Sequence, residues 1–200
     1  MNPAHFFAAV ASVTLYDPLA AMLGAARDGL IEYGYGDAVK LAGHSCPTVA
    51  GAYLMTLKAL TRLYPETTPE RGALRVELRG AQGDGVSGVV ASIASLITGA
   101  ASEGGFKGIA GRFSRQNLLR FAAPIASDLR VTRLDTGAAV AVAYHPEIVP
   151  APPALQALLP RVLAGEASDA ERAEFGRLWQ ARVRTLLIDA FDDPRLVVVT

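Results

Sequence analysis

The sequence has little of several residue types. It contains one cysteine in 200 residues, which excludes an internal disulfide framework, a zinc finger built from cysteines alone and an iron–sulfur cluster held by a single chain. Its 19 basic residues balance 19 acidic ones. A formal net charge of zero argues against a dedicated nucleic-acid-binding protein, because such proteins gain affinity from excess positive charge.

Long hydrophobic runs are also lacking. The longest apolar stretch, residues 86–101, is interrupted by serines and by Gly88, and it falls short of the roughly 20 residues that cross a bilayer. The apolar residues 1–16 have no Lys or Arg near them before Arg27, so they do not have the positive start of a secretory signal. We therefore expect residues 1–16 to form the first helix of a cytoplasmic protein with no membrane partner.

What the sequence does have is apolar character. Hydrophobic residues make up 51% and the mean hydropathy is +0.28, which excludes a disordered chain and favours one domain over residues 1–200. Charged residues make up only 19%, below the usual quarter. Part of the surface is therefore expected to be buried in a homo-oligomer such as a homodimer.

Helix and strand signals alternate in the first half of the chain. Strands are predicted at residues 31–41 and 73–79, and in a hairpin formed by 129–134 and 138–144. Helices are predicted at residues 17–26, 48–64, 86–98, 152–164 and 168–191. In the strand at 73–79, Arg75, Glu77 and Arg79 are expected to face water. Early alternation and a late hairpin predict an α+β fold with a mixed sheet of four to five strands covered by helices.

The segment Gly43-His44-Ser45-Cys46-Pro47 carries the clearest chemical signal. It precedes the helix at 48–64, so Cys46 falls at or beside the N-cap, where unpaired N–H groups and the helix dipole favour a thiolate. His44 can turn toward the same point. Thiolate and imidazole suit zinc or another borderline metal, and the same pair suits a nucleophilic cysteine with its base. The third interpretation is a purely structural turn.

These residues suggest a family. The run LAGHSCPTVAGAYLM resembles the start of the FmdE-like family, named after a component of formylmethanofuran dehydrogenase, which reads H-G-H-x-C-P-G, and ITGAASEGGFKG is similar to its second block. The resemblance covers residues 30–145. It implies a core like the C-terminal catalytic domain of glyceraldehyde-3-phosphate dehydrogenase, with zinc bound by the histidine and cysteine. It also implies an accessory or sensor role in one-carbon or molybdenum-enzyme systems.

The sequence departs from the family pattern at several positions. Ala42 stands where the family has its first histidine, and residues 150–192 form a predicted helical extension in place of a cysteine-rich zinc ribbon. His44 and Cys46 therefore carry over as metal ligands. Asp84, which stands where a family cysteine is missing, is the third candidate because zinc also accepts carboxylate oxygen. Its alternative role is a helix N-cap.

Further ligands and other functions stay open. His5 and His145 are the other histidines that can complete a metal shell. The alternative to an accessory or sensor protein is a small metal- or thiol-dependent enzyme that uses His44 and Cys46.

Two glycine-rich segments allow weaker interpretations. Residues 83–88 match G-x-G-x-x-G, but the preceding strand is not apolar on both faces, so a tight turn is favoured over nucleotide binding. Residues 104–108, together with Lys107, Arg112 and Arg115, form either a loop that holds an anionic ligand or a solvated loop.

Overall fold

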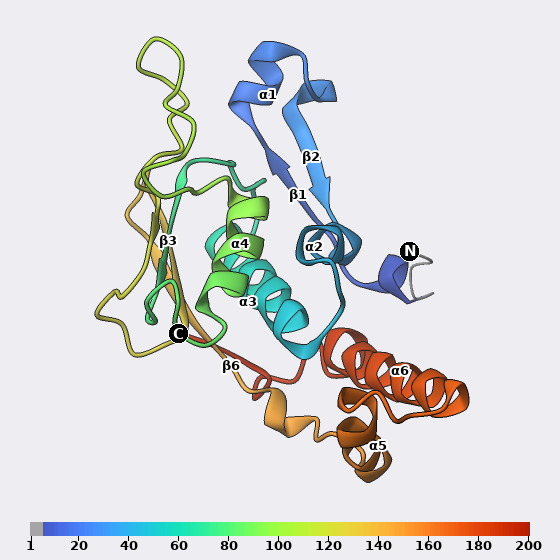
Figure 1. Cartoon of the computed structure of the whole chain (residues 1–200). Coiled ribbons are helices and arrows are strands. Elements are labelled where there is room, and N and C mark those ends of the chain that lie inside the picture. The colour runs from blue at the N-terminus through green and yellow to red at the C-terminus, as the bar shows by residue number, and fades with distance from the viewer. Residues whose placement is uncertain (1–5) are drawn as a thin grey trace.

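The protein is described from a computed structural model that covers residues 6–200 (Figure 1). It has an α+β fold built on a mixed five-stranded sheet with the strand order β4-β3-β5-β6-β7, so the predicted fold class is confirmed. Strands β3 and β4 are parallel, and the other neighbours are antiparallel. The strands are β3 (Leu74–Leu78), β4 (Leu119–Arg120), β5 (Leu129–Arg133), β6 (Ala139–Tyr144) and β7 (Val197–Val199).

Two helices cover this sheet. Helix α3 (Pro47–Leu63) packs against β6 and β7, and α4 (Ser87–Thr98) packs against α3 and β3. Figure 1 shows the two helices side by side on one face of the sheet. Buried residues occur on nearly all sides of α3, so this helix lies at the centre of the hydrophobic core. The predicted helix at 48–64 and the predicted hairpin are both present, within a residue or two of their expected limits.

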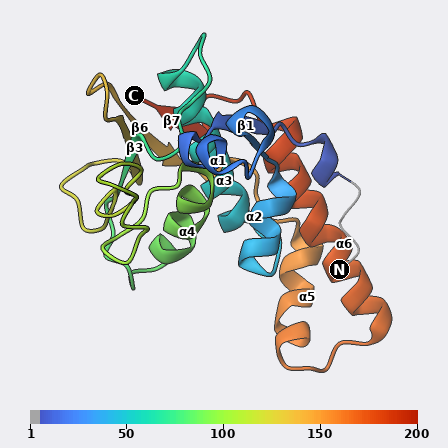
Figure 2. The ribbon, with the colours of Figure 1, turned by 90° about the horizontal axis from the view of Figure 1, so that it is seen from above.

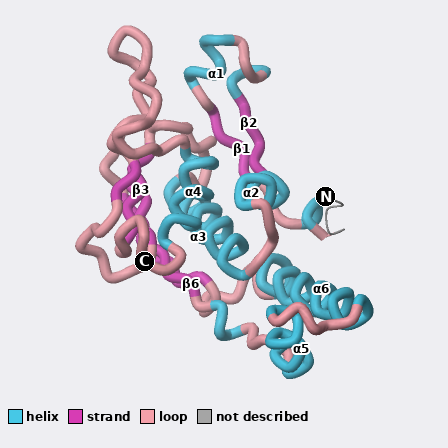
Figure 3. Tube along the Cα trace, in the orientation of Figure 1, coloured by secondary structure: helices cyan, strands magenta, loops and turns pink. Residues whose placement is uncertain are grey.

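A small two-stranded sheet lies beside this core. Strands β1 (Val13–Tyr16) and β2 (Leu30–Tyr33) are antiparallel, and α1 (Pro18–Leu23) lies between them in the chain. Asp17 caps α1 by accepting hydrogen bonds from the amides of Leu19 and Ala20. In Figure 3 the segment formed by β1, α1 and β2 projects beyond α2 (Tyr35–Ala42), at the same end of the molecule as the long loop between α4 and β4.

The C-terminal third adds two helices. Helices α5 (Pro153–Leu163) and α6 (Asp169–Arg184) pack against each other, and both Figure 1 and Figure 2 show them at one side of the molecule. The predicted capping box of Ser168 and Glu171 is present. The last turn of α6 continues as a π-helical turn, Thr185–Asp189. No helix within residues 6–200 is both long enough and apolar enough to cross a membrane.

Two predicted elements and one predicted side-chain orientation are wrong. The strand expected at 31–41 ends at Tyr33, and a helix follows because the Asp37 carboxylate accepts the Gly34 amide and closes the first turn of α2. Tyr35 is fully buried in that helix. The helix expected at 1–16 is a single 3₁₀ turn, Phe7–Ala9, followed by β1 within the described residues. The Glu77 side chain, expected to face water, is only 8% exposed, because its carboxylate pairs with Arg130.

Candidate functional site

The turn before α3 places Cys46 as the sequence predicts. Cys46 is the N-cap of α3, and its Sγ accepts a hydrogen bond from the Val49 amide at 3.5 Å. The side chain is half-buried. The sulfur therefore lies at the positive end of the helix dipole and accepts a backbone N–H there.

The neighbouring Ser45 holds this turn against two other helices. Its carbonyl oxygen accepts hydrogen bonds from Trp179 Nε1 at 3.0 Å and Gln180 Nε2 at 3.1 Å, both from α6. Its hydroxyl lies 2.9 Å from the Tyr35 hydroxyl of α2. Burial raises the pKa of Tyr35, so this phenol stays protonated at neutral pH. The turn is therefore fixed by contacts that do not use the Cys46 and His44 side chains.

His44 is exposed, and its ring is oriented by one hydrogen bond. Its Nδ1 lies 2.9 Å from the carbonyl oxygen of Ala42. Since a carbonyl only accepts, Nδ1 carries the proton of this hydrogen bond, and Nε2 is the ring nitrogen left to bind a metal. Metal-bound histidines commonly have this arrangement, with one ring nitrogen on a carbonyl and the other on the metal. His44 lines a cavity of about 160 Å³ against Val89 and Ile93 of α4.

The other candidate ligands lie elsewhere. The Asp84 carboxylate accepts the Ala81 amide at 3.0 Å and closes a turn after β3; it does not cap α4, whose N-cap is Val86. His145 Nδ1 lies 2.9 Å from a Glu147 carboxylate oxygen. His5 is outside the described residues. Across residues 6–200, no three His, Cys, Asp or Glu side chains come together in an arrangement that can hold a metal ion.

That finding bears on the predicted zinc site. His44 and Cys46 supply two donors of the types zinc binds, but the structure does not bring Asp84 to them as a third ligand. The described residues therefore supply at most two of the four donors that a zinc shell needs. Zinc binding by His44 and Cys46 stays a prediction.

A larger cavity, which the sequence did not predict, opens where α3 and α4 begin. It has a volume of about 450 Å³, and Pro47, the residue after Cys46, is part of its lining. Most of its surface is apolar, and polar groups are confined to a few positions. The apolar lining comes from Pro47, Met55, Leu78, Val86, Val90, Tyr144 and Pro146, and the polar lining from Thr48, Arg79, Asp84, Ser87 and Asp128. The only sequence signal at this place was the glycine-rich turn at residues 83–88.

Hydrogen bonds fix the walls of this cavity. Arg79 pairs with the Asp128 carboxylate at 2.8 Å, and the second oxygen of Asp128 accepts the Tyr144 amide at 3.0 Å. The Tyr144 hydroxyl donates to the Pro47 carbonyl at 3.0 Å. Burial raises the pKa of Tyr144, so its hydroxyl remains a donor. The Tyr144 ring lies over Gly51 of α3, where a Cβ would overlap it.

Comparison with known proteins gives no family assignment. No protein-family model matches the chain, and no curated protein matches it either.

Proposed function

We propose that this protein is an accessory or sensor protein that binds a small molecule in the cavity where α3 and α4 begin. The observation that carries this proposal is the cavity itself. Its volume of about 450 Å³ lies in the range of small-molecule sites, and such sites combine a largely apolar lining with a few fixed polar groups. The ion pair of Arg79 and Asp128 supplies polar groups that are already held in place.

The lining indicates the chemistry of the ligand. An apolar body would pack against Met55, Leu78 and Val90. The hydroxyls of Thr48 and Ser87 and the Arg79 guanidinium belong to residues that line the same cavity, and each of these groups can donate a hydrogen bond. Such donors attract an acceptor oxygen. The ligand class is therefore an apolar molecule that carries one hydrogen-bond acceptor.

Blocking the cavity tests this proposal. The Val86 side chain lines the cavity and is 53% exposed, so Val86→Trp fills its mouth without repacking the core. Leu163→Trp, at a residue 77% exposed on α5, is the matched control. With the fluorescent apolar anion anilinonaphthalenesulfonate as probe, we expect Val86→Trp to weaken binding at least tenfold and Leu163→Trp to leave it unchanged. Equal binding by both variants would rule the cavity out.

Zinc binding is the second candidate function. It is favoured by the His44 ring, whose Nδ1 is engaged by a carbonyl so that Nε2 is the free donor, and by Cys46 at a helix start. Zinc held there would supply a Lewis acid with coordination positions open to water or a small ligand. The Ala42 carbonyl would orient the His44 imidazole, and the Val49 amide would hold the Cys46 sulfur.

Metal analysis separates the zinc site from its alternatives. Chelator-free protein is expected to retain zinc, Cys46→Ala to lose it, and the control His145→Ala to keep it. In the alternative of a thiol-dependent enzyme, the protein lacks zinc and Cys46 alkylates quickly near neutral pH, whereas bound zinc protects the sulfur. Protein without zinc and with a slow-reacting thiol excludes both interpretations.

The family assignment rests on the sequence resemblance. The position of His44 and Cys46 ahead of the long helix α3 supports membership of the FmdE-like family. Further parts of the proposal are a core like that of glyceraldehyde-3-phosphate dehydrogenase, which comes with that assignment, and a cytoplasmic location and a homodimer, which rest on the sequence composition. The mixed five-stranded sheet with helices on one face supports the first of these.

A further inference from the structure

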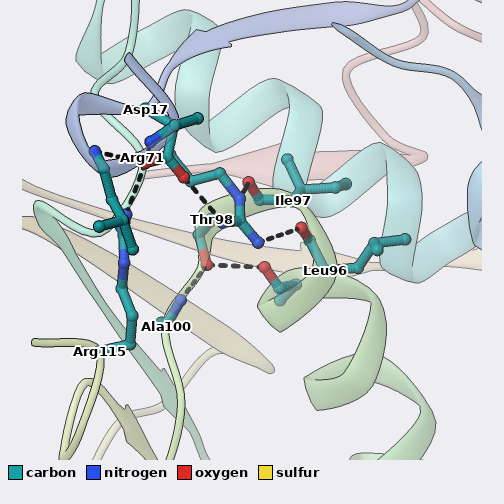
Figure 4. Close-up of polar contacts among 10 residues, drawn as sticks. Asp17, Arg71, Leu96, Ile97, Thr98, Ala100 and Arg115 are labelled. Atoms are coloured by element: carbon teal, nitrogen blue, oxygen red, sulfur yellow. Dashed lines mark hydrogen bonds and ion pairs between the residues drawn. The ribbon is translucent and has the colours of Figure 1, made fainter. Parts of the chain in front are cut away.

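Three charged side chains meet at the C-terminal end of α4 (Figure 4). The Asp17 carboxylate accepts Arg71 Nη1 on one oxygen at 3.0 Å and Arg115 Nη2 on the other at 2.9 Å. The side chains of Asp17 and Arg115 are 5% and 7% exposed. One buried carboxylate therefore serves two guanidinium groups, which leaves a positive charge without a partner inside the cluster.

Arg71 has a full set of partners, and Arg115 does not. Arg71 also donates to the carbonyl oxygens of Leu96 and Ile97, in the last turn of α4, where the helix dipole favours a cation. Within residues 6–200, Arg115 Nη1 is buried with no hydrogen-bond partner. An unpaired buried N–H is costly, and native structures seldom keep one without a ligand, ion or water beside it.

The backbone makes room for this guanidinium. Nη1 of Arg115 lies against Gly72, which has φ +88°, and a Cβ at this position would overlap the guanidinium. Gly99 provides a second close approach. Any larger residue at position 72 would move the Arg115 side chain.

A cavity of about 470 Å³ adjoins the cluster. Arg71, Arg115 and Gly72 line it, together with Glu70, Arg112 and Ser114. Arg112 is exposed, its guanidinium lies 4.8 Å from the Phe113 ring centre, and it forms no ion pair with any described residue. The three arginines of the cavity thus outnumber the two acidic residues of the lining and the cluster, Glu70 and Asp17. The Ser114 oxygen accepts the Gln116 amide, so its hydroxyl proton is available to a ligand.

We propose that this cavity binds an oxyanion group, a phosphate or a carboxylate, of a small molecule, with Arg112, Arg115 and Ser114 as its donors. An oxyanion would neutralise the surplus positive charge of the arginines at this cavity. Guanidinium groups match the geometry of both oxyanions through paired N–H donors. Lys107, which the sequence suggested as an anion ligand, is exposed and does not line this cavity.

This site is separate from the proposed small-molecule cavity. The first cavity lies at the N-terminal end of α4 and the arginine cluster at its C-terminal end; a helix of 12 residues spans about 18 Å. A failed test of one site therefore leaves the other unaffected.

Phosphate binding measured by calorimetry tests the proposal. Inorganic phosphate is titrated at constant ionic strength, with acetate as the carboxylate probe and chloride as the screening control. We expect saturable binding of phosphate, of acetate or of both, and none of chloride. The anion that binds with the higher affinity, phosphate or acetate, identifies the class of oxyanion that the cavity prefers. Phosphate and acetate heats no larger than those of chloride would overturn the proposal.

Variants assign the binding to this cavity. Arg112→Ala removes an exposed donor that forms no ion pair within residues 6–200, and we expect affinity for the bound oxyanion to fall at least tenfold. Arg62→Ala, which removes an exposed arginine at the end of α3, is the matched control and is expected to bind normally. Equal affinity in the two variants would overturn the proposal. Gly72→Ala, provided that circular dichroism shows it folded, is expected to lose binding because it displaces Arg115; retained binding would overturn the proposal as well.

Discussion

Asp17 shows how a residue's environment sets its charge. Burial opposes its ionisation, but hydrogen bonds from the Ala20 amide and Arg71, with the nearby charge of Arg115, outweigh burial and hold the pKa of Asp17 below its usual value. The Arg130 hydrogen bond likewise lowers the pKa of Glu77. Both carboxylates therefore stabilise the fold while ionised.

The role of the ionised Asp17 is tested by measuring the free energy of unfolding as the pH is lowered. Because the folded-state pKa of Asp17 lies below its unfolded value of about 3.8, its contribution is complete above about pH 5 and is lost as pH falls through the folded-state pKa. Asp17→Asn should lower the free energy of unfolding at pH 7 by about 3 kcal/mol, because two arginines lose a buried partner. It should also make urea denaturation less dependent on pH between 5 and 2.

A matched carboxylate provides the control. Asp28 is exposed and, within residues 6–200, pairs only with the exposed Arg27, so Asp28→Asn should change stability by less than about 0.5 kcal/mol. Equal losses in the Asp17 and Asp28 variants would contradict the role assigned to the buried cluster.

At the scale of elements, local signals predicted those with a regular period or a cap. The capping box before α6 and the alternation in β5 and β6 depend on neighbours in the chain. The strand expected at 31–41 failed because Ile31, Tyr33 and Tyr35 alternate across Gly34, while the cap that starts α2 comes from Asp37. The burial of Glu77 could not be predicted either, because its partner Arg130 is on another strand.

Gly51 of α3 lies against the Tyr144 ring of β6, so the sign of the stability change on replacing Gly51 can be predicted. In Gly51→Ala the new Cβ would overlap the Tyr144 ring, so β6 and α3 would have to separate locally, and we expect a loss of about 1–3 kcal/mol in unfolding free energy. In Gly176→Ala, within α6, the Cβ meets open space, and the variant should gain about 0.5–1 kcal/mol. Thermal denaturation of both proteins checks the opposite signs; a stabilised Gly51→Ala would show that the ring moves freely.

At the scale of the whole molecule, the cavities could not be predicted from local sequence patterns. The cavity at the starts of α3 and α4 combines Pro47, Leu78, Asp128 and Tyr144, which are far apart in the chain. His44 and Cys46 could be placed beside a helix start because that signal is local. Whether Asp84 joins them depends on how separate elements pack, and sequence spacing carries no information on that.

The low charged fraction leads to a prediction about assembly. Several large apolar side chains are exposed, among them Met22, Leu23 and Leu30. Burying such surface in a second copy is favourable, so light scattering during size exclusion should give about twice the chain mass of 21.0 kDa. Dilution should shift this mass toward the single chain. A mass of one chain at all concentrations would contradict the expected homodimer.

The π-helical turn after α6 has a consequence for how this helix opens. Leu186 and Leu187 in the turn are fully buried, whereas Val183 is the one buried residue described within α6 itself. The fully buried side chains are therefore concentrated at the C-terminal end of this helix. Its first turns should fray and reclose in the native state and lose their amide protons to deuterium within minutes, while the turn at 185–189 should retain its protons until the molecule unfolds as a whole.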